Sequence, residues 1–292
     1  MKTRAISLFV VTALLAASAL AQDDKQLKSH DELNQGVEAY KNGRYADAVE
    51  HSDAQRHMVR ASLTWLFKEA LSLDPSNQNA QLYLATAYYI QWVPGADSPA
   101  NAANHDSAKE QFEAALEKDA KNDLALSMMA SMEYNSAMAA GKPEQKADAL
   151  DEAKKWNERR IEANPKIAEP YYYLGVISWA EAYGPIMKAR VEAHIPVTAQ
   201  GPIEDPEIRE PLKDKYWEMI QDGIGNLQRC LEIDPENEDA MTYANLLFRI
   251  RAMLEESAST AEDDVAQAES WEKKALETKQ NKAAKTPSDR QE

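Results

Sequence analysis

Histidines and acids at metal-binding or catalytic spacing are the first features to test, because they would give the chain a reaction to catalyse. The zinc motif HExxH, a nucleophile-elbow serine, a phosphate-binding glycine loop and a dinucleotide fingerprint are all missing from the sequence. His51 and His57 are six residues apart, which places them on different faces of a helix. Asp234, Glu236 and Glu238 alternate like calcium ligands, but the glycine that a calcium loop requires is missing. We therefore expect no metal, no cofactor and no catalytic residue.

An acid–base set in the least regular part of the chain is the enzymatic alternative. Glu192, His194 and Asp205 could exchange protons with a substrate. Nothing in the sequence fixes their geometry, so a protein that is not an enzyme is the expectation.

The N-terminus has the three parts of an export signal. Lys2 and Arg4 are basic, residues 5–17 are apolar, and Ala19-Leu20-Ala21 provides the small residues before a cleavage site at Gln22. The apolar run is shorter than the roughly 20 residues that span a bilayer, and no later stretch is apolar enough. We expect an exported protein, periplasmic or secreted, with no integral membrane span after signal cleavage.

The net charge of −16 argues against a nucleic-acid partner, because phosphate binding needs a basic face. An acidic surface keeps an exported protein soluble. The alternative is an acidic face that selects a basic partner.

A short corner recurs along the chain after Ala- and Leu-rich helical stretches. Proline disfavours helical geometry in the residue before it, so the Asp-Pro pair is expected to end a helix. Pro75, Ala120 and Pro165 are spaced 45 residues apart, Pro235 follows after 70, and Gln280 after another 45. The full corners read Leu73-Asp74-Pro75-Ser76-Asn77 and Ile233-Asp234-Pro235-Glu236-Asn237.

Each interval between corners predicts two helices. The first carries large apolar residues, as in residues 82–89. The second carries small and bulky residues on one face, as in Ala108, Phe112 and Ala115. Pro99 and Pro143 are expected at the starts of second helices, which would make these helices about 20 residues long.

This alternation resembles the tetratricopeptide repeat (TPR) family over roughly residues 29–282; Gly36, Tyr40, Gly43 and Ala48 match the family pattern. The family's usual period is about 34 residues; HEAT and armadillo repeats have the longer period but lack this corner. The resemblance implies an all-α fold, a right-handed TPR-like solenoid of about five helix–turn–helix repeats with long second helices. The expected parts are a signal peptide at 1–21, a linker at 22–28, repeats at 29–77, 78–122, 123–167, 168–237 and 238–282, and a disordered tail at 283–292.

The fourth repeat contains the largest insert, at about 181–222. It begins with Tyr183-Gly184-Pro185-Ile186, continues through a Pro- and Gly-rich stretch, and ends in a charged helix over about 206–222. Long insertions in a periodic chain are often functional, so Tyr183, Pro185 and Ile186 are candidate contact residues. A packed flap that shields the repeats is an equal alternative.

In the TPR family the first helices line a concave groove that contacts a peptide or protein. The resemblance therefore implies a ladder of contact residues at equivalent positions of the first helices. Aromatic and Arg side chains are favoured there because they dominate interface energies. The alternative is that the rings pack between neighbouring repeats. The ladder residues are Tyr40, Tyr89, Tyr134, Trp179 and Arg249.

The favoured function is thus a non-enzymatic interaction scaffold in the cell envelope, binding a protein or extended peptide on its concave face. The alternative is a periplasmic accessory protein for small-molecule or solute transport.

Overall fold

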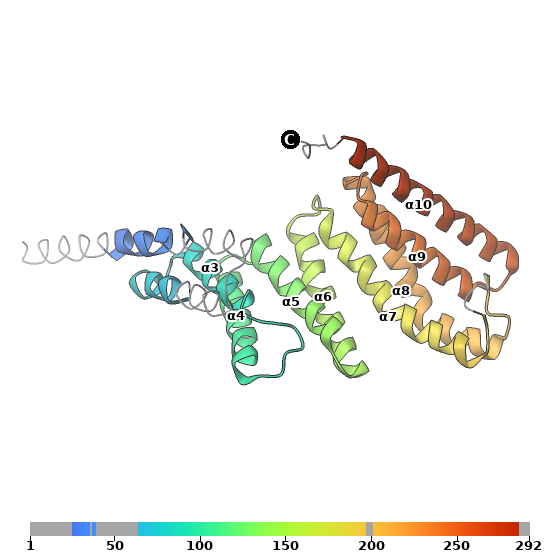
Figure 1. Cartoon of the computed structure of the whole chain (residues 1–292), viewed down its shortest axis with the longest axis horizontal. Helices are drawn as coiled ribbons and strands as arrows, with labels where there is room; N and C mark the ends of the chain where they lie inside the picture. Colours follow the sequence, from blue (N-terminus) through green and yellow to red (C-terminus); the bar gives the residue numbers. More distant parts are fainter. Residues whose placement is uncertain (1–24, 36, 39–63, 197–200, 286–292) are drawn as a thin grey trace, which may run out of the picture. The chain divides into compact units, whose positions relative to one another are not determined.

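The computed structural model describes residues 25–35, 37–38, 64–196 and 201–285 (Figure 1). All regular elements within these ranges are helices, without a strand, so the predicted all-α fold is confirmed. The chain forms two compact units, Met1–Met132 and Glu133–Glu292. The expected signal peptide and Tyr40 lie outside the described residues.

The first unit contains helices at 25–35 and 64–73, followed by α3 (Gln78–Tyr89), α4 (Pro99–Lys118) and the first part of α5 (Asp123–Ala139). Ser29 joins the helices at 25–35 and 64–73, because its buried Oγ donates a hydrogen bond to the carbonyl of Ala70 over 2.8 Å. The core between the early helices and α3 consists of Leu33, Phe67, Ala70, Ala80, Leu84 and Ala87.

The second unit contains the end of α5 and five further helices. Figure 1 shows α7 to α10 packed side by side, with α6 in contact with α7. Their core includes Ile220, Leu227, Cys230 and Leu247, all without exposed surface. The five helices are α6 (Pro143–Ala163), α7 (Glu169–Glu192), α8 (Pro206–Ile233), α9 (Glu238–Leu254) and α10 (Ala258–Lys285).

The corners are held by side-chain hydrogen bonds that recur from repeat to repeat. Asp74 Oδ1 accepts from the backbone N–H of Ser76 (2.9 Å), and Asn77 Oδ1 caps α3 by accepting from the N–H of Ala80 (3.0 Å). Asp119 and Asn122 repeat both bonds although no proline follows Asp119. The Asp and Asn side chains therefore build this corner even where proline is missing. The same pair of bonds recurs at Asp234 and Asn237.

The second helices are long, as predicted. They contain 20 residues in α4, 21 in α6 and 28 in both α8 and α10. Pro99 and Pro143 are the first residues of α4 and α6, where a missing backbone N–H costs no intrahelical hydrogen bond.

The insert of the fourth repeat, for which a functional segment and a packed flap were equal alternatives, is largely helical. α7 continues through Gly184 and Pro185 to Glu192, and α8 runs unbroken from Pro206 into the predicted second helix. Proline removes one intrahelical hydrogen bond, but Ala182 and Ile186 are fully buried on either side of it. Packing of these side chains thus keeps α7 continuous despite the helix-breaking Gly184 and Pro185. Most of the insert lengthens the two helices, and only residues 193–205 connect them.

The connection is anchored to the next repeat. Ile203 is fully buried, and its backbone N–H donates to the carbonyl of Met253 over 2.9 Å. Two predicted boundaries also differ from those in the structure. Residues 25–28, assigned to a linker, are helical, and α10 extends to Lys285, three residues into the predicted disordered tail.

Across the described ranges, every helix is too short or too polar to cross a membrane.

Candidate functional site

Six aromatic side chains from three first helices form a contiguous group in the second unit. The ring centroids of Tyr134 and Tyr173 are 5.9 Å apart, those of Tyr172 and Tyr243 5.8 Å, and those of Trp179 and Tyr183 4.9 Å. Contacts between Tyr172 and Tyr173 (5.2 Å) and between Trp179 and Tyr243 (5.6 Å) complete the chain of rings. We call this group the aromatic cluster: Tyr134 on α5, Tyr172, Tyr173, Trp179 and Tyr183 on α7, and Tyr243 on α9.

The helical repeat of α7 explains how one helix supplies most of the cluster. Tyr172, Trp179 and Tyr183 are separated by seven and then four residues, which places them on the same side of a helix. Trp179 connects this side of α7 to Tyr243 of α9, and the neighbouring Tyr173 contacts Tyr134 of α5.

The cluster is only partly exposed, and burial changes the acidity of its hydroxyls. Burial raises the pKa of Tyr172, and the nearby Tyr243 and Asp239 raise it further. Burial also raises the pKa of Tyr134 and of Tyr243. These phenols therefore stay neutral at physiological pH and can both donate and accept hydrogen bonds. Tyr183 is the most open member, with 41% of its surface exposed.

Trp179 lies between Tyr183 and Tyr243 in the cluster. Its indole Nε1 is buried and has no hydrogen-bond partner in the part of the chain that the structure describes. An unpaired buried donor costs about 1–3 kcal/mol, which the ring contacts of Trp179 with Tyr183 and Tyr243 offset.

Within the second unit, the structure brings together two of the three predicted ladder residues that it contains. Tyr134 and Trp179 belong to the aromatic cluster. Tyr89 lies on α3 in the first unit, with its ring 6.1 Å from that of Trp92. Arg249 pairs with Glu272 of α10 over 2.9 Å and also donates to Asn245. Tyr40 is outside the described residues.

The three insert candidates have different environments. Tyr183 stacks on Trp179 and is exposed. Pro185 is exposed on α7. Ile186 has no exposed surface and belongs to the core, so its choice as a contact residue is wrong. Tyr183, Gly184 and Pro185 are exposed and Ile186 is buried, so the insert presents one side of its helix to solvent and another to the core.

Three members of the cluster were missed from the sequence. Tyr173 and Tyr243 follow their corners by the same number of residues as Tyr83 follows its own. This shared offset was a usable indication that a second aromatic position recurs in the first helices. Tyr172 has no such counterpart, and only the packing of α7 against α9 reveals its role.

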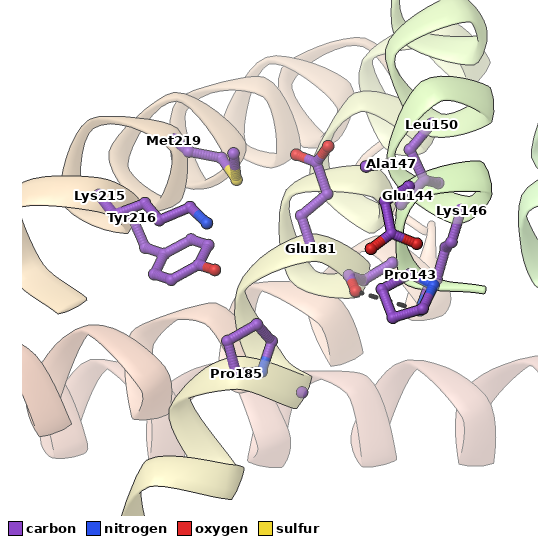
Figure 2. Close-up of a pocket in the computed structure, with 12 residues that line it drawn as sticks. Pro143, Glu144, Lys146, Ala147, Leu150, Glu181, Pro185, Lys215, Tyr216 and Met219 are labelled. Atoms are coloured by element: carbon purple, nitrogen blue, oxygen red, sulfur yellow. Dashed lines mark hydrogen bonds between the residues drawn. The ribbon is translucent and has the colours of Figure 1, made fainter.

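A pocket of about 460 Å³ lies between α6, α7 and α8 (Figure 2). Leu150, Ala180 and Tyr216 are buried at its base, and Glu181 and Met219 are half-buried beside them. Its rim is formed by the exposed Pro143, Glu144, Ala147, Gly184, Pro185 and Lys215, together with the half-buried Lys146.

Two of the three residues in the enzymatic alternative form contacts with residues close to them in the sequence. Glu192 pairs with Lys188 over 3.8 Å, and Asp205 caps α8 by accepting from the N–H of Glu207. Within the described ranges, no three His, Cys, Asp or Glu side chains gather closely enough to hold a metal ion.

No protein-family model and no curated protein matches the chain. Among solved structures, it is similar to a crystal structure of MamA, with 15% identity, a TM-score of 0.47, and coverage of 89% of this chain and 97% of that one. It is also similar to TTC0263, a thermophilic TPR protein of Thermus thermophilus, with 18% identity, a TM-score of 0.38, and coverage of 75% and 98%. YrrB, described as a TPR protein with an unusual peptide-binding site, shares 16% identity and a TM-score of 0.39, with coverage of 76% and 84%.

Because these identities and TM-scores are low, the fold is assigned from the helices of this chain and not from the comparisons. Its helix pairs, joined by equivalent corners, define a TPR-like repeat fold. The resemblance predicted from the sequence is thereby confirmed.

Proposed function

We propose that the chain is a non-enzymatic interaction scaffold that holds a protein segment against the aromatic cluster of its second unit. The partly exposed rings on α5, α7 and α9 are the observation that carries this proposal. Aromatic side chains contribute large contact areas at interfaces and lose few rotatable bonds on binding. The neutral phenols add hydrogen-bond donors and acceptors for a peptide backbone.

The charge around the cluster favours a partner segment that is neutral or basic. Asp239 is exposed and near enough to Tyr172 and Tyr243 to raise their pKa values. The whole chain carries a net charge of −16. Complementary charge speeds association and selects among partners.

Export of the chain is part of the same proposal. The basic, apolar and small-residue parts of residues 1–21 support secretion to the periplasm or beyond. Expression of the full chain in a bacterium, followed by the intact mass of the protein from the periplasmic fraction, tests this. We expect a mature chain that begins at Gln22; full-length protein confined to the cytoplasm would contradict it.

The binding surface can be tested by photo-crosslinking in the native cell. A photoreactive phenylalanine analogue at Tyr183 should crosslink a partner, whereas the same analogue at Val191 should not. Val191 is the matched control, because it is also exposed on α7 but is not part of the aromatic cluster. Tyr134→Ala and Tyr243→Ala should each weaken the crosslink at residue 183 by about tenfold or more, the effect of losing an interface hot spot.

Thermal unfolding of each variant separates loss of binding from loss of folding. Equal crosslinking at residues 183 and 191, or full crosslinking by folded Tyr134→Ala and Tyr243→Ala variants, would refute this surface.

The pocket between α6, α7 and α8 supports the second candidate function, an accessory protein for small-molecule transport. Its volume of about 460 Å³ is within the range of small-molecule sites, roughly 300–1,000 Å³.

A further inference from the structure

The pocket between α6, α7 and α8 lies on a different side of α7 from the aromatic cluster. Glu181 follows Trp179 by two residues, which turns it about 200° around the helix axis. A ligand in the pocket and a protein segment on the aromatic cluster would therefore contact different faces of the second unit. The inference below rests on the pocket and not on the scaffold function.

Gly184 and Pro185 keep one wall of the pocket open. A Cβ atom added to Gly184 would meet no atom within 4 Å, so the space beside it is free. Proline within a helix also leaves the carbonyl four residues earlier without its intrahelical donor. Pro185 lies near Glu181, which the preceding turn of α7 carries (Figure 2).

Glu181 is the unusual group in this pocket. Its carboxylate forms no hydrogen bond or ion pair with any residue in the described ranges, although the side chain is half-buried. Burial raises its pKa, and the nearby Asp151 raises it further, while Lys154 and Lys146 act in the opposite direction. A half-buried carboxylate without a direct partner leaves a desolvation cost that a cation could offset.

The two lysines that line the pocket already have other partners. Lys146 Nζ donates to the backbone carbonyl of Ala180 over 3.4 Å. Lys215 Nζ lies 5.1 Å from the centre of the Tyr216 ring, in a cation–π contact. Neither lysine forms an ion pair with Glu181 or Glu144 among the residues described. Both carboxylates therefore stay available to a ligand.

The rest of the pocket is apolar and close to Glu181. Figure 2 shows the Glu181 side chain between Met219 and Tyr216 of α8 on one side and Leu150 of α6 on the other, with Pro185 below it in this view. Such walls suit a hydrocarbon or aromatic body rather than a strongly hydrated one.

We propose that this pocket binds a small organic ammonium ion with an apolar body. Its ammonium group pairs with Glu181 and is attracted by Glu144 at the rim, and its apolar part lies against Leu150, Tyr216 and Met219. Phenethylamine has this chemistry and serves as the probe, with 2-phenylethanol as its neutral counterpart and 3-phenylpropionate as its anionic counterpart.

The test is an NMR titration of the full mature chain labelled with 13C at the methionine methyl groups. Met219 lines the pocket, so its methyl resonance reports binding at this site; the Met219→Leu spectrum assigns it. Phenethylamine should shift this resonance to saturation and bind at least about tenfold more tightly than 2-phenylethanol, since a charge-assisted contact is worth that much. 3-Phenylpropionate should bind more weakly than either.

Glu181→Gln keeps the shape of the side chain and removes its charge. It should weaken phenethylamine binding at least about tenfold and leave 2-phenylethanol binding unchanged. Glu192→Gln is the matched control on the same helix, because its exposed side chain is outside the pocket, and it should change neither affinity. Gly184→Leu fills the open wall and should abolish binding of both probes.

Two results would overturn the proposal. One is a Met219 methyl resonance that does not respond to phenethylamine in the folded wild-type chain. The other is a phenethylamine affinity that is the same in wild type and folded Glu181→Gln, or no higher than that of 2-phenylethanol. Circular dichroism of each variant confirms folding, and photo-crosslinking at Tyr183 is read separately, so failure here and failure of the scaffold proposal are distinguishable.

Discussion

Two glycines on α8 should respond in opposite ways to the same substitution. Gly223 is buried where α8 crosses α7 and α9, whereas Gly225 is exposed two residues later. A Cβ atom at Gly223 would be 2.6 Å from Ser178 Cβ and 2.9 Å from Leu247 Cδ1. A Cβ atom at Gly225 would meet nothing within 4 Å. Alanine therefore creates a clash at one position and none at the other.

The magnitude follows from these contacts. The distance to Ser178 Cβ is about 0.8 Å below the 3.4 Å at which ordinary contact begins, and this atom cannot rotate away because it is fixed to the backbone. The helices must separate, which costs about 1–3 kcal/mol, and this tight two-sided contact belongs near the upper end. Alanine also gains about 1 kcal/mol over glycine in any helix interior.

We therefore expect Gly225→Ala to stabilise the chain by about 1 kcal/mol and Gly223→Ala to destabilise it by about 2 kcal/mol. The difference between the two variants isolates the steric cost, because the helix-propensity gain is common to both. Chemical denaturation followed by circular dichroism measures both changes in the free energy of unfolding. The variants are compared provided that the slope of this free energy with denaturant concentration is the same in each.

A stabilising Gly223→Ala would refute the reasoning. It would show that α7 and α8 can separate without cost, so that close approach is not what Gly223 provides.

Three further outcomes test other parts of the structure. Ala120→Pro should raise the unfolding free energy by about 0.4–1 kcal/mol, measured by thermal or chemical unfolding. The equivalent corners carry Pro75 and Pro235, and proline reduces the conformational freedom of the unfolded chain. A loss of stability would show that this corner differs from the others. Glu181→Gln should be more stable than wild type at neutral pH and equally stable below pH 4.5. The reason is that a raised carboxyl pKa makes ionisation of Glu181 unfavourable in the folded state as pH increases. The same difference in unfolding free energy at both pH values would contradict this. Cys230 should resist alkylation at about pH 8 until the chain is unfolded. Burial raises its pKa to about 11, which leaves roughly 100-fold less thiolate than in an ordinary cysteine. Rapid labelling of the native chain would show that the core between α8 and α9 opens readily.

The sequence determined the repeat architecture because its causes are local. An Asp that binds the N–H two residues later and an Asn that caps the next helix need only a few neighbouring residues, as at Asp119 and Asn122. Proline at the first helical position likewise predicted the starts of α4 and α6. Helix length followed from the distance between a start and the next corner.

Tertiary structure decided what local rules leave open. Gly184 and Pro185 read as a break, but burial of Ala182 and Ile186 keeps α7 continuous through them. The aromatic cluster depends on contacts between α5, α7 and α9, as does the role of Tyr172 within it. The pocket exists only because α6, α7 and α8 meet around Glu181. Each of these features joins residues far apart in the sequence, and packing between helices, rather than any local pattern, sets which side chains meet.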